Sequence, residues 1–323
     1  NIQARDKLGN TVLHAAVRWN ATACVPLLIQ SGLDKNIQNL TGDTALHQAV
    51  RIGMGTIAKL LIQNNVDLEM RNNQGNTPLF EAISSGVPSS VELLLEAGAD
   101  PMARNINGDT PLHIAVASNQ KEICNLLISR GAAIHAQNVR GKTPFQLAMA
   151  SSPEIVGVLL TKDRLSLSDD FGRSPLHIAV LNGAPLPIIK TIVELGARLN
   201  MVDSQGKNAL RVAVELEAWD TARYLIDSGA DLFNKASDGE SAATIIITKG
   251  SEVIKTLLNS KNINNRDALG NTVLHYAAIK ANADTIKTLL DLGALKNVKN
   301  SEDETPYDIA KRWNKTNIIN LLK

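Results

Sequence analysis

The octapeptide Gly108-Asp109-Thr110-Pro111-Leu112-His113-Ile114-Ala115 recurs in recognisable form along the whole chain. The copies, counted from the residue that matches Thr110, open at Thr11, Thr44, Thr77, Thr110, Thr143, Ser174, Asn208, Ser241, Thr272 and Thr305. The first residues of successive copies are 33, 33, 33, 33, 31, 34, 33, 31 and 33 residues apart. The copies at Asn208 and Ser241 are eroded, that is, they depart furthest from the octapeptide. A near-constant period over ten copies predicts a solenoid, in which each unit packs only on its neighbours.

The copy at Thr110 indicates why each period should fold as two short helices. Gly108 lies in a turn that needs a positive φ, and Thr110 has the small polar side chain preferred at a helix N-cap. Pro111 follows at the first helical position, where its missing N–H costs nothing. Apolar residues spaced three and four apart continue beyond this point, and Gly131 is placed to end a second helix.

A second phrase, Leu-Leu-x-x-Gly-Ala-Asp, recurs in phase with the first, for example at residues 94–100. With the Thr-Pro-Leu-His-x-Ala phrase and the period, it makes the chain similar to the ankyrin repeat family. The resemblance covers residues 1–323 and implies one all-α solenoid of about ten repeats, with paired antiparallel helices and short β-hairpin finger loops. Residues 1–6 resemble the tail of a preceding repeat and include no initiator Met, so we expect the first repeat to continue from missing upstream sequence.

Composition narrows the classes of partner. The formal net charge is only +1. The chain therefore lacks the strongly basic character expected of a nucleic-acid-binding protein, and we expect no nucleic-acid partner. No apolar run reaches the roughly 18 residues that a membrane span requires, so we expect no direct membrane insertion. Cys24 and Cys124 lie three repeats apart, too far for a disulfide, and are expected to be buried core residues. This pattern is compatible with a cytoplasmic protein, and we expect a monomer that binds a protein partner.

Five of the six histidines occupy one position in the repeat, namely His14, His47, His113, His177 and His275. They could be metal ligands or catalytic bases, or each could be a structural residue of its own repeat. Neighbouring positions lie about 10 Å apart. Zinc ligands lie about 2.0–2.1 Å from a shared ion, so the regular position favours the structural role. The family resemblance implies that this histidine bonds to the Thr of its own motif and helps to hold the next finger.

The family resemblance also indicates where a partner would bind. In ankyrin-like proteins, partners meet the concave face, which the finger tips and the exposed side of the first helices build. Applied here, it predicts one contact patch made of Arg5, Leu8, Arg18, Trp19, Leu40, Arg51 and Ile52. Exposed apolar groups mark binding surfaces, and Trp and Arg are common interface anchors. A basic row along the fingers and a further apolar tip extend the candidates to Arg71, Arg104 and Ile106.

Other interpretations of these residues stay open. Trp19 and Ile52 could fold against the adjacent helix, and the arginines could be solvated without a partner. Missing upstream repeats could also cover this surface. Basic residues along the fingers are common in the family, so the basic row could be either a dedicated site for an acidic ligand or an ordinary feature of the fold.

Motifs for catalysis, phosphate binding and metal binding are absent from the sequence, so we predict that the chain is not an enzyme and has no cofactor and no metal site. The first hypothesis is a non-enzymatic scaffold that binds a partner protein on its concave face and finger tips. The second is a regulatory or tethering segment of a larger enzyme or channel. The third is an exported bacterial protein that acts on host or envelope proteins, and the abundance of Asn, Ile and Lys is compatible with it.

Overall fold

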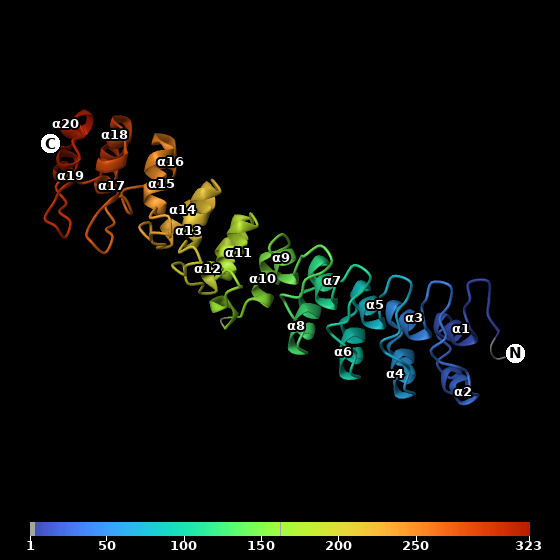
Figure 1. The fold of residues 1–323 in the computed structure, drawn as a ribbon. Coiled ribbons are helices and arrows are strands. Elements are labelled where there is room, and N and C mark those ends of the chain that lie inside the picture. Colours follow the sequence, from blue (N-terminus) through green and yellow to red (C-terminus); the bar gives the residue numbers. More distant parts are fainter. Residues whose placement is uncertain (1–3, 162) are drawn as a thin grey trace. The chain divides into compact units, whose positions relative to one another are not determined.

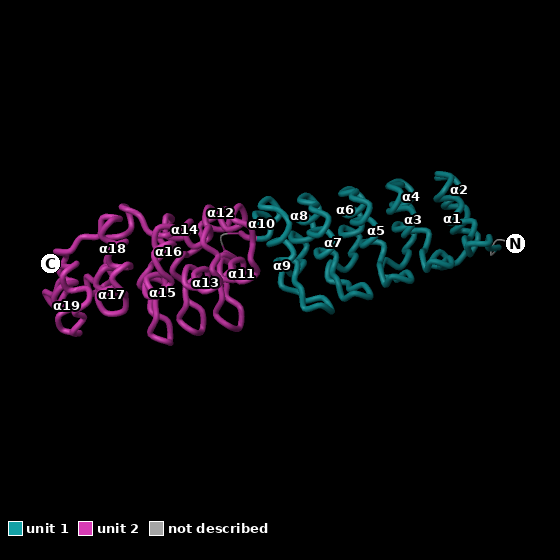
Figure 2. Tube along the Cα trace, turned by 90° about the horizontal axis from the view of Figure 1, so that it is seen from above, with its two compact units in different colours: residues 1–159 teal, residues 160–323 magenta. Residues whose placement is uncertain are grey.

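The computed structural model describes residues 4–161 and 163–323, which form two compact units, Asn1–Leu159 and Leu160–Lys323 (Figures 1 and 2). The helices of the first unit are α1 (Val12–Arg18), α2 (Cys24–Gln30), α3 (Ala45–Arg51), α4 (Gly55–Gln63), α5 (Pro78–Ser84), α6 (Pro88–Glu96), α7 (Pro111–Ala117), α8 (Lys121–Ser129), α9 (Pro144–Ala148) and α10 (Pro153–Leu159). Each pair of helices corresponds to one copy of the motif.

The second unit opens with a short 3-10 helix, η1 (Arg164–Ser166), and continues with five more helix pairs. These are α11 (Pro175–Leu181), α12 (Leu186–Glu194), α13 (Ala209–Glu215), α14 (Trp219–Asp227), α15 (Ala242–Lys249), α16 (Ser251–Leu257), α17 (Val273–Lys280), α18 (Ala283–Asp291), α19 (Pro306–Arg312) and α20 (Thr316–Leu322). The eroded copies at residues 208 and 241 therefore fold as ordinary repeats.

Within each unit the helices form two rows, because equivalent helices of successive repeats pack on one another. In the first unit, α1, α3, α5, α7 and α9 form one row and the even-numbered helices form the other. The second unit repeats this alternation from α11 to α20. Small and branched apolar side chains fill the seams, and Leu46, Ala49 and Val50 of α3 are buried in this way. The predicted all-α architecture of paired helices is confirmed.

The histidine of the motif joins its own helix to the next finger. In the first repeat, the Thr11 backbone N–H donates to His14 Nδ1 (3.2 Å), and the Thr11 hydroxyl contacts the same nitrogen (2.9 Å). Because Nδ1 accepts, Nε2 carries the proton, and it donates to the Asp43 carbonyl oxygen (2.9 Å). His47, His113, His177 and His275 make the same set of contacts. The structural role predicted for these histidines is confirmed.

The eroded seventh copy keeps this connection with different chemistry. Asn208 caps α13 by accepting the Arg211 backbone N–H (2.8 Å), and Arg211 stands where the other copies have histidine. The Arg211 side chain is only 3% exposed, and its Nη1 donates to the Glu240 carbonyl oxygen (2.5 Å), 29 residues further on. Asp238 neutralises the guanidinium at 2.6 Å. Arginine thus replaces the imidazole as the link to the next finger.

The third copy has lost this connection at its histidine position, which Phe80 occupies. The Phe80 ring is buried, but it offers no nitrogen to the preceding threonine. As a result, Thr77 Oγ1 is buried without a hydrogen-bond partner among the described residues.

The finger loops are closed by turns and by contacts with the next finger. In the first finger the Gly9 N–H donates to the Asp6 carbonyl oxygen (2.9 Å), with Gly9 at φ 74°. The Leu40 N–H of the second finger then donates to the Leu8 carbonyl oxygen (3.0 Å). Across the described residues, the only isolated β-bridge lies between residues 202 and 208. The Asp6 N–H donates to the Asn10 carbonyl oxygen across the finger (3.0 Å), and Asn39 and Asp43 make the equivalent bond in the second finger (2.9 Å). The fingers are therefore short hairpin-like loops closed by one such bond and a turn.

The two cysteines differ in their surroundings. Cys124 is buried inside α8, and burial raises the pKa of its thiol to about 12. Cys24 is the first residue of α2 and is exposed, so the prediction that both thiols are buried is wrong for Cys24.

Stability should fall when the bridging histidines become protonated. Burial lowers the pKa of His14, His47, His113, His177 and His275 below the ordinary value of 6.5. The unfolded chain therefore binds more protons than the folded chain just below about pH 6.5, and folding free energy is lost as the pH falls through this window. We expect the urea midpoint to be highest above about pH 7 and to decrease steadily towards about pH 5. Asp43 ionises with a pKa below 3.8 and contributes only at lower pH. A midpoint that is constant between about pH 7 and 5 would contradict this assignment.

A matched pair of substitutions tests the unequal roles of the motif threonines. Thr77 and Thr110 are each 1% exposed, but only Thr110 Oγ1 contacts a histidine, His113 Nδ1, at 2.8 Å. We expect Thr77→Val to leave the free energy of unfolding unchanged or to raise it, because it removes an unpaired buried hydroxyl. Thr110→Val should lower it by about 1–2 kcal/mol. Urea denaturation of both variants provides the measurement, and equal losses would show that the Thr–His contact contributes nothing.

Candidate functional site

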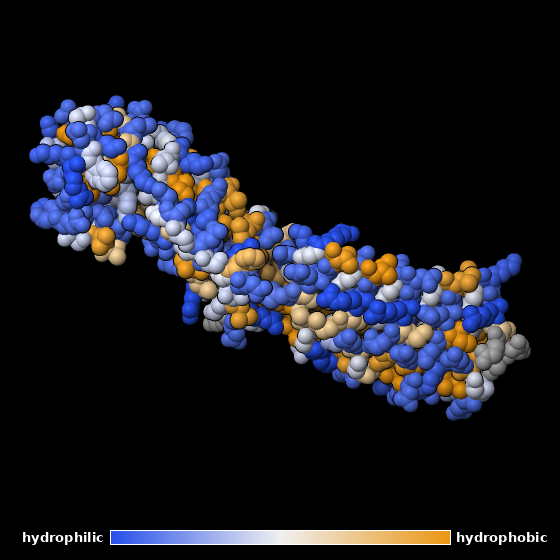
Figure 3. Space-filling model, viewed as in Figure 1, coloured by the Kyte–Doolittle hydropathy of each residue, from blue (hydrophilic) through white to orange (hydrophobic). Residues whose placement is uncertain are grey.

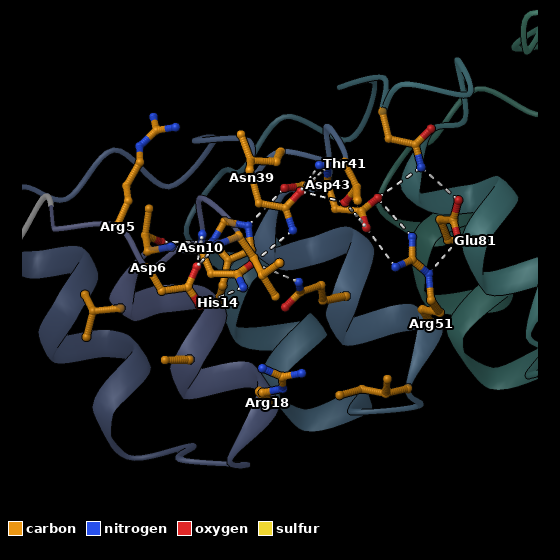
Figure 4. Close-up of a pocket in the computed structure, with 18 of the residues that line it drawn as sticks. Arg5, Asp6, Asn10, His14, Arg18, Asn39, Thr41, Asp43, Arg51 and Glu81 are labelled. Carbon is orange, nitrogen blue, oxygen red and sulfur yellow. Dashed lines mark hydrogen bonds and ion pairs between the residues drawn. The ribbon is translucent and has the colours of Figure 1, made fainter.

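A groove of about 1120 Å³ lies in the first unit between three finger loops and the helices α1, α3 and α5. Its walls come from residues 4–12, 39–43 and 72–74 of the fingers and from the exposed side of the helices (Figure 4). All seven residues of the predicted contact patch line this groove, namely Arg5, Leu8, Arg18, Trp19, Leu40, Arg51 and Ile52. Sequence positions up to 47 residues apart therefore meet on one surface (52 minus 5).

The apolar side chains of the groove are exposed. Trp19 is 79% exposed and Leu40 68%, while Leu8 and Ile52 are about half exposed, at 56% and 48%. Trp19 and Ile52 are the C-cap residues of α1 and α3, where the chain leaves the helix and the side chain faces outward. The alternative in which Trp19 folds against the adjacent helix is wrong. Figure 3 shows apolar side chains interrupting the hydrophilic surface of this unit on the face in view.

Arg51 is held by two carboxylates at one end of the groove (Figure 4). Its Nη1 and Nη2 atoms donate to the two oxygens of Asp43 (2.7 and 2.9 Å), and its Nε donates to Glu81 (2.7 Å). Asn72 Nδ2 donates to both carboxylates (3.0 and 2.9 Å) and so connects them. The Arg51 side chain remains 39% exposed, whereas the two carboxylates are buried. The interpretation of Arg51 as a solvated arginine without a partner is therefore wrong.

The hydrogen bonds of this cluster shift its ionisation. Donation to Asp43 raises the pKa of Arg51, and the contact with Glu81 adds to the shift. Burial by itself would raise the pKa of Asp43, but the hydrogen bonds from Arg51 and Asn72 outweigh burial and lower it. Arg51 is thus a permanent cation whose charge is already balanced inside the protein.

Three of the predicted residues lie outside the groove. Arg71, Arg104 and Ile106 are exposed on the fingers but do not line it. Arg104 Nη1 donates to the Gln137 carbonyl oxygen (2.6 Å), and Arg5 Nη1 makes the equivalent bond to Gln38 (3.3 Å). The finger arginines thus connect successive fingers. The basic row has a structural role at these positions, and a role in binding remains a prediction.

The sequence interpretation missed the polar partners of the groove. Asp43, Asn72 and Glu81 hold Arg51, while Asn10 and Gln48 line the same groove as Arg18 and are bonded to each other (3.3 Å). The spacing of Asp43 eight residues before Arg51 and of Glu81 30 residues after it is visible in the sequence, but only the packing of neighbouring repeats shows that these side chains meet.

The described parts of the chain hold no group of three or more His, Cys, Asp or Glu side chains able to share a metal ion. None of the helices described is both long and apolar enough to cross a membrane.

The repeated helix pairs and linked fingers define a repeat protein of the ankyrin type. The family model for ankyrin repeats (3 copies) matches residues 13–105, 100–169, 148–236, 220–300 and 242–323. The chain therefore belongs to the ankyrin repeat family. Ankyrin repeats serve in protein–protein interaction, and this chain is an interaction module of that kind.

Several much longer proteins contain a similar stretch. Neurogenic locus notch homolog protein 1 of Homo sapiens is 34% identical over 146 residues, which is 44% of this chain and 6% of that protein. The Danio rerio protein of that name is 35% identical over 144 residues, 43% of this chain and 6% of that protein. A Danio rerio protein named "Putative palmitoyltransferase ZDHHC13" is 26% identical over 160 residues, 48% of this chain and 25% of that protein. The chain thus spans a small part of the length of these relatives.

The buried carboxylate of Asp43 should contribute more to stability than a surface ion pair does. We expect Asp43→Asn to lower the free energy of unfolding by about 1–2 kcal/mol, because Arg51 loses its bidentate partner while its exposure limits the loss. Glu252→Gln is the control, since Glu252 pairs with Lys255 with its side chain 88% exposed. This control should change the free energy of unfolding by less than about 0.5 kcal/mol. Equal effects in urea denaturation would rule out a structural role for the Asp43–Arg51 pair.

Proposed function

We propose that the chain is a non-enzymatic scaffold that binds a partner protein through the groove of its first unit. The proposal rests on four apolar side chains that line one groove, those of Leu8, Trp19, Leu40 and Ile52. Each of them is exposed to solvent. Contiguous exposed apolar groups mark interaction sites. Trp19 is the expected anchor, because tryptophan is among the residue types that most often dominate binding energy.

A preformed frame supports this proposal. The backbone of each finger bonds to the next, as Leu40 does to Leu8, and the histidines hold the fingers to the helices. A partner would therefore meet side chains on a frame that is already ordered, so that little conformational entropy is lost on binding.

A second candidate function is a regulatory or tethering segment within a larger protein. The lengths of the relatives favour it, because the similar stretch is 6% of human neurogenic locus notch homolog protein 1 and 25% of the Danio rerio protein with a palmitoyltransferase name. In that case the groove would receive a segment of the same polypeptide. The full gene product distinguishes the two, since a catalytic or membrane domain in it would favour the second candidate.

Affinity capture with matched tryptophan variants tests the groove. Trp19 and Trp313 are the C-cap residues of α1 and α19, both are exposed, and each follows an arginine. We expect Trp19→Ala to reduce recovery of a captured partner at least tenfold, or about 1.4 kcal/mol, while Trp313→Ala leaves recovery unchanged. Quantitative mass spectrometry of the captured protein provides the readout. Equal recovery by the Trp19 variant and the unsubstituted chain would exclude the groove as the binding surface.

A further inference from the structure

Three arginines occupy the same place, the last residue of a first helix: Arg18 in α1, Arg51 in α3 and Arg312 in α19. Arg51 is paired with Asp43 and Glu81, as described above. Arg312 is paired with Glu304 (3.0 Å) and more loosely with Glu302 (3.4 Å). Arg18 differs from both, because it has no hydrogen-bond or ion-pair partner in the described segments. It lines the groove, and Figure 4 draws no contact to it.

The difference comes from two residues. Arg51 has Asp43 eight positions before it and Glu81 30 positions after it. At the same distances Arg18 has Asn10 and Gln48, the neutral amides of the same side-chain shapes. Glu304 likewise lies eight positions before Arg312. The first repeat thus has amides where the Arg51 cluster has its two carboxylates. Its own acid is Asp6, which stands where the second finger has Asn39; the Asn10 side-chain amide and, more weakly, the charge of Arg18 lower the pKa of Asp6.

The two clusters match in geometry. Asn72 Nδ2 donates to Asp43 Oδ1 (3.0 Å), and the equivalent Asn39 Nδ2 donates to Asn10 Oδ1 (2.9 Å). Gln48 Nε2 also donates to Asn10 Oδ1 (3.3 Å). The amide oxygen that could have faced Arg18 is therefore used by other amides, which leaves the guanidinium of Arg18 to solvent.

The groove contains an arginine without a hydrogen-bond partner among the described residues, whereas each of its carboxylates already accepts several hydrogen bonds. Its lining contains three arginines, Arg5, Arg18 and Arg51, and three acids, Asp6, Asp43 and Glu81. Asp6 accepts the backbone N–H groups of Leu8 (2.8 Å) and Asn10 (2.9 Å), as well as the Asn10 side-chain amide (3.0 Å). Asp43 and Glu81 are filled by the Arg51 cluster. Arg5 donates one hydrogen bond, to the Gln38 carbonyl oxygen (3.3 Å), and Arg18 makes no hydrogen bond or ion pair with the residues that the structure describes.

We propose that Arg18 is a receptor for a carboxylate of the partner protein, an Asp or Glu side chain adjacent to a large apolar side chain that packs on Trp19. This inference rests on the proposed function of the groove and specifies its partner as an acidic, apolar segment. Asn10 fills the place that Asp43 has at Arg51, so the carboxylate would approach the guanidinium of Arg18 from the groove, with the paired hydrogen bonds that Asp43 accepts from Arg51. Trp19, Leu40 and Ile52 line the same groove with exposed apolar surface. A nucleic acid fits less well, because the acids of the lining equal its arginines in number.

The first variant supplies carboxylates to Arg18 from within the chain. Asn10→Asp combined with Gln48→Glu places around Arg18 the two carboxylates that hold Arg51 and keeps the side-chain shapes. It also removes the donation of the Asn10 amide to Asp6 (3.0 Å), so its unfolding temperature is compared with that of the unsubstituted chain. Arg18→Gln is the companion variant, which removes the cation at an exposed position and should fold normally. Arg312→Gln is the matched control, since Arg312 has the same place in its helix and is already paired.

The probe is a phage-displayed library of random peptides of about 12 residues, selected on the whole 323-residue chain. We expect the enriched peptides to carry Asp or Glu next to Leu, Ile, Phe or Trp. The Kd of a resynthesised peptide should increase at least tenfold with Asn10→Asp/Gln48→Glu and with Arg18→Gln, and stay within about twofold with Arg312→Gln. Thermal unfolding verifies that each variant is folded.

The outcomes separate this inference from the function on which it rests. Enriched peptides without acidic residues, or peptides whose binding depends on Trp19 but not on Arg18, would overturn the carboxylate receptor and leave the groove as a binding surface. Binding that survives Trp19→Ala as well would overturn both. A selection that yields no binder would overturn the receptor for short acidic segments, whereas capture of a folded partner that depends on Trp19 would still support the groove.

Discussion

The packing of each helix pair on the next is the constraint on which the rest of each unit depends, and a hydrogen bond from a buried side chain to the next finger fixes its register in the repeats that have histidine or Arg211 at the motif position. A single helix pair cannot bury its apolar faces alone, so it must be fixed against a neighbour in one register. His14 provides this by bonding to its own Thr11 on one side and to the Asp43 carbonyl on the other. Burial of the imidazole is tolerated because both nitrogens have partners. Where histidine is replaced by Arg211, the bond to the Glu240 carbonyl is retained, so two residue types can make the same link. The third repeat, with Phe80 at this position, keeps its packing without the link.

The packed helix pairs and the hydrogen bonds between fingers allow neighbouring side chains to vary without loss of the fold. One such side chain is that of the last residue of the first helix of a repeat. With acids around it, as at Arg51 and Arg312, an arginine is balanced within the protein. With amides around it, as at Arg18, the same shape leaves the charge available. In our proposal, two changes from carboxylate to amide convert an internal contact into a candidate binding group, because the frame keeps the equivalent residues at the same positions in each repeat.

Much of the architecture was predictable, since its determinants are local or strictly periodic. Thr110 and Pro111 mark the start of a helix through capping and a fixed φ, and these effects act within one turn. The exposed positions of Leu40 and Trp19 followed from apolar residues at places where the repeat should face water. Cys24 was placed wrongly because helical periodicity gives the buried face of a helix but not the exposure of its first residue.

The sequence by itself determined the ten helix pairs, the histidine position and the seven residues that gather around one groove, because each depends on a pattern that repeats within about one period. Only the tertiary structure decided which of the patch arginines is available. That property depends on a residue 30 positions further on, such as Glu81 for Arg51 or Gln48 for Arg18, which packing brings beside the guanidinium. Ion pairs and hydrogen bonds form between groups that are close in space. Whether the charge of an arginine is balanced within the protein therefore depends on the side chains that the fold places next to it.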